Sequence, residues 1–98
     1  MDKQKNDSDW IYLFVNNPGK DESFAGLFDE ELGIRFIPAF YEKESALICS
    51  GRFMDRHATY EVQAIHKDDL KHYATENDVL IFILDKAGSI LEKIMPKT

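Results

Sequence analysis

The chain has 98 residues, 44% of them hydrophobic and 31% charged, a composition that supports one globular domain and excludes a disordered chain. Eighteen acidic and twelve basic residues give a net charge of −6, so the chain lacks the basic face that binding to a nucleic-acid duplex requires. The longest apolar run, residues 79–84, is too short to span a membrane, and the polar start carries no export signal, so we expect a cytoplasmic protein.

The start of the chain divides into a polar leader and a strongly apolar strand. Residues 1–9 are charged and amide-rich without apolar anchors, which predicts a disordered leader before a single domain over residues 10–98. In residues 10–15, aromatic side chains alternate with aliphatic ones, so both faces of the predicted strand must be covered. Residues 16–19 read Asn-Asn-Pro-Gly and predict a turn.

Residues 23–33 allow two interpretations. Phe24, Leu27, Phe28 and Leu32 fit a short helix that Gly33 would end, since glycine is common just after a helix. A short strand over residues 23–28 is the alternative.

The rest of the chain alternates strand and helix patterns. Pro38 lies within a predicted strand over residues 34–41, and because proline cannot donate to a β-ladder, we expect an edge position or a bulge there. Asp68 or Asp69 is the expected N-cap of the second helix. The other predicted elements are a helix over 42–54, a half-exposed strand over 59–65, a helix that ends near Asn77, and a hairpin of strands 78–85 and 90–95.

These elements predict a fold class. Two helices that interleave with a mostly antiparallel sheet of about 4–5 strands indicate an α+β two-layer sandwich, ferredoxin-like or related, which ends in a β-hairpin.

One corner gathers basic and titratable side chains. Arg52, Arg56 and His57 follow the first predicted helix, and two arginines beside a histidine, together with Arg35, could bind a carboxylate or a phosphate. In the simpler interpretation, the two arginines only complement the negative end of their helix dipole, while Asp55 pairs with one of them.

A second candidate is a surface for protein contacts. Residues 20–31 hold five acids and one base, and residues 57–78 hold five acids and two bases. Acids around exposed aromatic side chains are typical of an interface to a basic protein. Because helices normally cover one face of a sheet, strands that are apolar on both faces also predict a homodimer. The candidate interface residues are Trp10, Tyr12, Phe24, Phe28, Glu30 and Glu31.

Other chemistry finds little support. Cys49 is the single cysteine, which excludes an internal disulfide and a cysteine-rich zinc site. His66 and His72, with two aspartates between them, lack a recognised metal-ligand spacing, and no nucleophile motif is present. We expect no catalytic residues, no metal and no cofactor, although a small hydrolase remains a third hypothesis.

Two segments carry a resemblance to known families. Residues 11–16 before a polar turn, and residues 36–41 that run into the acidic stretch 42–46, resemble small cyanobacterial and plastid α+β domains of unknown function. Residues 36–40 followed by acids are also similar to a junction in the SseB-like N-terminal domain of secretion-associated proteins. Each resemblance covers roughly a third of the chain through β-to-α patterning. Neither implies catalytic residues.

The leading functional hypothesis is a small acidic, non-enzymatic protein-interaction module, such as a regulator, an inhibitor or an immunity-type protein. Its expected partner is a protein, in keeping with the acidic charge a basic one, and we expect neither nucleic acid nor membrane as partners. The alternative is a domain that binds a small ligand or an anion through Arg52, Arg56 and His57.

Overall fold

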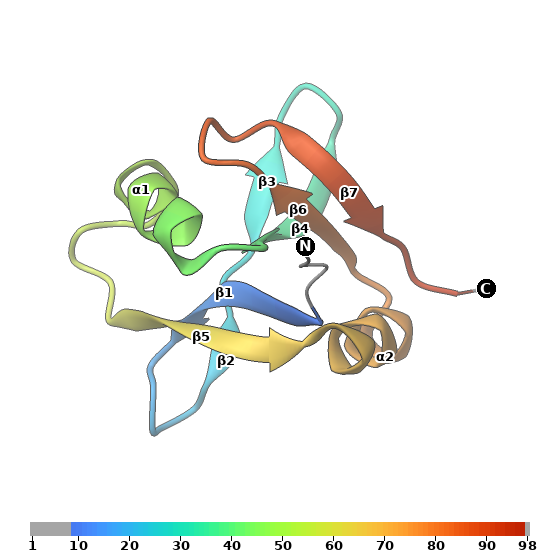
Figure 1. Cartoon of the computed structure of the whole chain (residues 1–98), viewed down its shortest axis with the longest axis horizontal. Coiled ribbons are helices and arrows are strands. Elements are labelled where there is room, and N and C mark those ends of the chain that lie inside the picture. The colour runs from blue at the N-terminus through green and yellow to red at the C-terminus, as the bar shows by residue number, and fades with distance from the viewer. Residues whose placement is uncertain (1–8, 98) are drawn as a thin grey trace, which may run out of the picture.

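The computed structural model describes residues 9–97, so the expected leader lies outside the described residues except for Asp9. The described residues form a seven-stranded sheet with two helices, an α+β fold (Figure 1). The elements in chain order are β1 (Trp10–Asn16), β2 (Ser23–Phe24), β3 (Leu27–Asp29), β4 (Ile34–Phe40), α1 (Lys43–Phe53), β5 (Tyr60–His66), α2 (Lys67–Asn77), β6 (Leu80–Leu84) and β7 (Ile90–Ile94).

The sheet is larger than expected, and it is mixed. Its strand order is β2-β1-β4-β6-β7, while β5 pairs with β1 and β3 pairs with β4. Most neighbours are antiparallel, but β4 and β6 run parallel, from Phe36 opposite Leu80 to Phe40 opposite Leu84. The prediction of about 4–5 strands missed the short strands β2 and β3, because two or three residues carry no period that a sequence can show.

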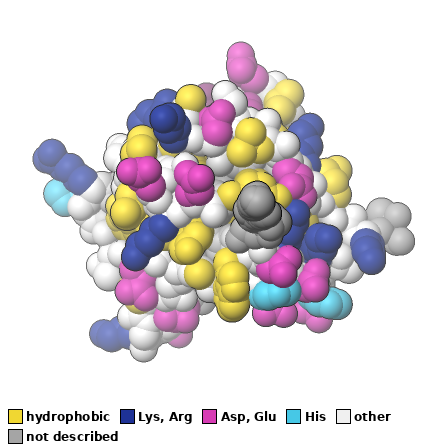
Figure 2. All heavy atoms as spheres, viewed as in Figure 1, with side chains coloured by type: hydrophobic (Ala, Val, Ile, Leu, Met, Phe, Trp, Pro, Cys, Tyr) yellow, Lys and Arg dark blue, Asp and Glu magenta, His cyan; other side chains and the backbone are white. Residues whose placement is uncertain are grey.

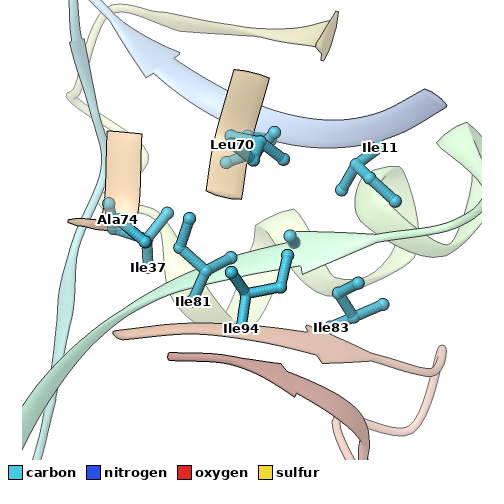
Figure 3. Close-up of a cluster of buried hydrophobic side chains, with 9 residues drawn as sticks. Ile11, Ile37, Leu70, Ala74, Ile81, Ile83 and Ile94 are labelled. Carbon is cyan, nitrogen blue, oxygen red and sulfur yellow. The ribbon is translucent and has the colours of Figure 1, made fainter. Parts of the chain in front are cut away.

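The two helices lie on opposite faces of the sheet (Figure 1). On one face, α2 buries Leu70 and Ala74 against a layer of aliphatic side chains (Figure 3). On the other, α1 buries Ala46 and Cys49 against phenylalanines. We call these the α2 face and the α1 face. The aliphatic layer includes Ile11, Ile37, Ile81, Ile83 and Ile94, and the phenylalanines are Phe14, Phe40 and Phe82.

This arrangement corrects the prediction of a two-layer, ferredoxin-like sandwich. Successive side chains of a strand point to opposite faces, so the doubly apolar strands β1 and β6 need cover on both sides. One helix on each face supplies that cover, which gives three layers. The homodimer prediction assumed that one face stays bare, and that premise is wrong.

Residues 23–33 form two short strands followed by a turn, so the helical interpretation is wrong and the strand alternative is confirmed in part. β2 pairs with the end of β1, with Phe24 opposite Val15, and β3 then pairs with the start of β4. A turn at residues 30–33 joins β3 to β4. Gly33 fits it because its φ of 68° lies in the left-handed region, and its N–H donates to the carbonyl of Asp29 at 2.7 Å.

Pro38 lies in an interior strand, so the expected edge position is wrong. β4 pairs with β6 on one side, and on the other side with β3 over residues 34–36 and with β1 over residues 39–40. Pro38 therefore lies at the gap between two partners. A residue without a backbone N–H is tolerated there because the ladder is already interrupted.

The remaining elements follow the sequence closely. β1 begins at Trp10 as expected, α1 and β5 match their predicted segments, and β6 and β7 form the predicted hairpin. α2 differs at its start, because its N-cap is His66, whose Nδ1 accepts from the N–H of Asp68 at 3.3 Å. Asp68 and Asp69 lie in the first turn instead, where their charge favours the helix dipole. Between residues 9 and 97, no helix is long and apolar enough to cross a membrane.

Candidate functional site

A ring pair on the α2 face marks the candidate site. Phe24 lies opposite Val15 and therefore shares the face of the buried β1 side chains. Tyr73 follows Leu70 by three residues on α2 and so lies beside it on the inner side of the helix. The two rings meet edge to face with centroids 4.8 Å apart. This contact joins β2 to α2 across a long sequence separation.

A hollow lies on each side of the ring pair, and together they form a surface that we call the Phe24–Tyr73 groove. The first hollow, about 320 Å³, is the Glu22 hollow, and the second, about 330 Å³, is the Arg35 hollow. Apolar side chains make up much of the lining of both. Besides the ring pair, the Glu22 hollow is lined by Val15, Glu22, Ser23, Gln63 and Ile65. The Arg35 hollow is lined by Gly26, Arg35, Phe36, Ile37, Asp78 and Val79.

Two carboxylates lie in the walls of this groove, and others lie near it on neighbouring elements. On α2, Asp69 and Glu76 lie four residues before and three residues after Tyr73, so they share its side of the helix. On β5, Glu61 points to the same face as Gln63, whose amide donates to the Glu61 carboxylate at 2.6 Å. Figure 2 shows further acidic side chains, together with histidines, on the outer surface of α2 at its lower right, away from the lining of the two hollows. The walls themselves hold two acids, Glu22 and Asp78, and one base, Arg35, so with these neighbours the acids outnumber the bases around the groove.

The lining of the groove combines apolar side chains with a few polar groups. An apolar pocket with a few convergent polar groups is the usual form of a binding site. Ser23 lines the Glu22 hollow, and among the described residues no histidine lines either hollow. The groove can therefore bury apolar surface and attract positive charge.

A second polar cluster lies at the other flank of α2. Lys67 donates to the hydroxyl of Tyr41 at 2.9 Å and forms an ion pair with Glu92 at 2.8 Å, while the Tyr41 hydroxyl donates to the Glu92 carboxylate. These three side chains come from the residue after β4, the start of α2 and the middle of β7. They close the border of the α2 face.

The pKa shifts of this cluster are those of a structural contact. Partial burial and the bond to Glu92 raise the pKa of Tyr41. Partial burial would lower the pKa of Lys67, but its bonds to Glu92 and Tyr41 outweigh burial and raise it. Burial would raise the pKa of Glu92, but the interactions with Lys67 and Tyr41 together have the larger effect. The pKa of Glu92 is therefore lowered. These directions favour the charged forms of Lys67 and Glu92, so the cluster stabilises the ion pair.

The basic residues that the sequence suggested as an anion site do not come together as one cluster. Arg52, Arg56 and His57 are all exposed. Arg52 lies over the ring of Phe53, and the His57 N–H donates to the carboxylate of Asp55 at 2.8 Å. Within residues 9–97, no hydrogen bond or ion pair joins the three. Arg52 instead packs against its own helix, over Phe53 and beside Cys49.

The expected interface residues fall on different surfaces. Tyr12 packs on the α1 face, and Trp10, 52% exposed, shares that face and meets the ring of His66. Phe24 is on the α2 face and forms the groove, whereas Phe28 is 56% exposed beyond it. Glu30 and Glu31 lie in the turn after β3 and line neither hollow. The structure therefore brings only Phe24 of this set into the groove.

Sequence reasoning missed most of the acidic rim. Glu61, Asp69, Glu76 and Asp78 belong to the acid-rich stretch 57–78, which was the available signal. Their convergence depends on β5 pairing with β1 while α2 packs over the same face of the sheet, and the sequence does not show that.

Metal binding has no support in the described part of the chain. Among residues 9–97, no three His, Cys, Asp or Glu side chains come together as a metal site. His66 caps α2, and His72 is exposed on its outer side.

No family model, no curated protein and no solved structure matches the chain, so both resemblances drawn from the sequence stay predictions.

Proposed function

We propose that this chain is a small non-enzymatic protein-interaction module that holds a basic protein partner in the Phe24–Tyr73 groove. The observation that carries the proposal is the combination of an apolar floor with a rim of carboxylates. A partner that places an apolar side chain beside lysine or arginine would bury surface and meet opposite charge in one step. Such a module would serve as a regulator, an inhibitor or an immunity-type protein.

Two comparisons within the molecule support this choice. The polar cluster of Tyr41, Lys67 and Glu92 is closed on itself by an ion pair and hydrogen bonds, which suits a stabilising contact. A second copy of this chain suits the groove poorly, because each copy carries a net charge of −6. The anion-binding alternative rests on Arg52, Arg56 and His57. Within residues 9–97, no hydrogen bond or ion pair brings these three side chains together to hold one anion.

The test is site-specific photo-cross-linking in the cells that make the protein, followed by binding with purified components. A photoreactive residue replaces Ser23 in the groove, and as a control it replaces Leu47, which is 53% exposed on α1. We expect cross-links to a basic protein from position 23 only. That partner is then purified and titrated against wild type and variants.

The variants separate the groove from the rest of the surface. Phe24→Ser removes half of the ring pair, and Glu76→Lys reverses a rim charge without touching the core. Leu47→Ser and Glu30→Lys are the matched controls outside the groove. Loss of binding in both groove variants with retention in both controls supports the proposal. Equal affinity for all four variants overturns it, as does a partner that cross-links only from position 47.

A further inference from the structure

The two hollows of the groove differ in charge. Glu22 is the one charged residue in the wall of the Glu22 hollow, and Glu61 stands beside it next to Gln63. The Arg35 hollow instead carries one base and one acid in its wall, Arg35 and Asp78. Positive charge is therefore attracted mainly to one end of the groove.

The ring pair makes the groove bipartite. Phe24 and Tyr73 line both hollows and stand between them, so each hollow receives a different side chain of an occupant. Each has a volume of about 320 or 330 Å³. Hollows of this size are at the lower end of binding pockets and suit single side chains rather than a folded domain. In an extended peptide, alternate side chains point to the same side and can enter two neighbouring hollows.

We infer, resting on the proposed function, that the partner element is a short linear segment with two apolar anchors beside basic residues, its more basic end over the Glu22 hollow. The anchors fill the two hollows on either side of the ring pair. The basic side chains meet Glu22 and Glu61 at one end, while the other end carries less positive charge because Arg35 repels it.

The experiment uses three hexapeptides, each acetylated and amidated, titrated against the full chain labelled with ¹⁵N. The first alternates lysine with phenylalanine and leucine, the second replaces lysine with glutamate, and the third replaces the apolar residues with serine. We expect amide shifts from the first peptide alone, centred on Phe24, Gln63 and Tyr73. The affinity should fall as salt is added, since part of it comes from exposed charges.

Charge variants of opposite sign give the sharpest readout. Glu61→Lys should weaken binding of the lysine peptide by roughly two- to fivefold, the range of an exposed charge contact. Arg35→Glu should strengthen it by a similar factor, roughly two- to fivefold, because a repelling charge becomes an attracting one. Glu30→Lys, outside the groove, should change it little. All three sites are exposed, so folding is not at risk.

The outcomes separate this inference from the proposed function. Equal binding of the glutamate peptide, shifts confined to the α1 face, or no binding by any peptide overturns the linear segment. If the peptides fail but binding of the purified partner is still lost in the Phe24 and Glu76 variants, the proposed interaction module is supported and only the linear segment is refuted. If neither the peptide nor the partner responds to groove variants, both fail. Opposite effects of Glu61→Lys and Arg35→Glu support the assigned direction, and effects of the same sign overturn it.

Discussion

Lys67 and Glu92 form a 2.8 Å ion pair that joins the first residue of α2 to the middle of β7. The Tyr41 hydroxyl bonds to both, so the cluster connects three elements that are distant in sequence. Because β7 pairs with a single neighbour, β6, within the described residues, this is the polar contact that ties the outer strand to a helix.

Loss of the ion pair should lower stability by a modest amount that depends on pH. We expect Lys67→Met to cost about 1 kcal/mol at pH 7, a small value because the Glu92 side chain is 39% exposed and its charge is screened. The pKa of Glu92 is lowered in the folded state, so its contribution is present above its ordinary value of 4.5 and is lost as pH falls through the lower folded value. The pKa of Lys67 is raised, so its contribution is lost only as pH rises past 10.5.

Urea unfolding of wild type and Lys67→Met between pH 7 and pH 2.5 checks this. The difference in the free energy of unfolding should shrink steadily below pH 4.5. Tyr41→Phe is the control, since it removes the hydroxyl but keeps the ion pair. A difference that stays constant down to pH 2.5 would contradict a contribution from Glu92.

The cap of α2 makes a second prediction. His66→Ala should destabilise the protein by about 1 kcal/mol because the N–H of Asp68 loses its acceptor. His66→Asn should recover most of that loss, since asparagine is a good N-cap. Both variants lose the ring contact with Trp10, so their difference isolates the cap. Chemical denaturation and hydrogen exchange of the Asp68 amide measure it, and identical values for the two variants would refute the capping role.

The turn between β6 and β7 depends on one carboxylate. Asp85 accepts from the N–H groups of Ala87 and Ser89, each at 2.9 Å, while Gly88 takes a φ of 88°. Asp85→Ala leaves both donors to solvent and should cost roughly 1–2 kcal/mol, whereas Asp85→Asn keeps an acceptor and should cost less. Thermal unfolding of both variants compares them. If Asp85→Asn is as damaging as Asp85→Ala, the charge rather than the acceptor geometry holds the turn.

Local pattern decided which parts of the fold could be predicted. β1, α1, β5 and the closing hairpin each span enough residues for a period of two or of 3.6 to show, and these predictions are confirmed. Residues 23–33 could not be resolved, because β2 and β3 are too short for either period and owe their shape to pairing with β1 and β4.

Which face of the sheet each helix covers could not be predicted from the local sequence pattern. The doubly apolar strands were recognised correctly, but whether a helix or a partner covers the second face depends on which side α1 and α2 cross. The parallel pairing of β4 with β6, which includes Phe40 opposite Leu84, joins distant segments and sets those crossings. The homodimer therefore stays a prediction that has lost its premise.

The candidate site was predicted only in part, for the same reason. Phe24 was chosen for its aromatic ring among acids, but no local pattern indicated its contact with Tyr73. Glu61 and Asp69 lie on different elements, so the acidic rim exists only after β5 and α2 flank β1.

The ring pair itself should be coupled energetically. Edge-to-face aromatic contacts contribute about 0.5–1.5 kcal/mol beyond the apolar area they bury, so Phe24→Leu and Tyr73→Leu together should cost less than the sum of the two single changes. The free energy of unfolding of wild type, both single variants and the double variant gives the coupling directly. Phe28→Leu combined with Tyr73→Leu is the control, because Phe28 is exposed and its effect should simply add. A coupling of this size means that the ring pair between the two hollows forms before any partner binds, so the groove is preorganised. Strictly additive effects of Phe24→Leu and Tyr73→Leu would instead mean that the ring contact forms only when the partner binds.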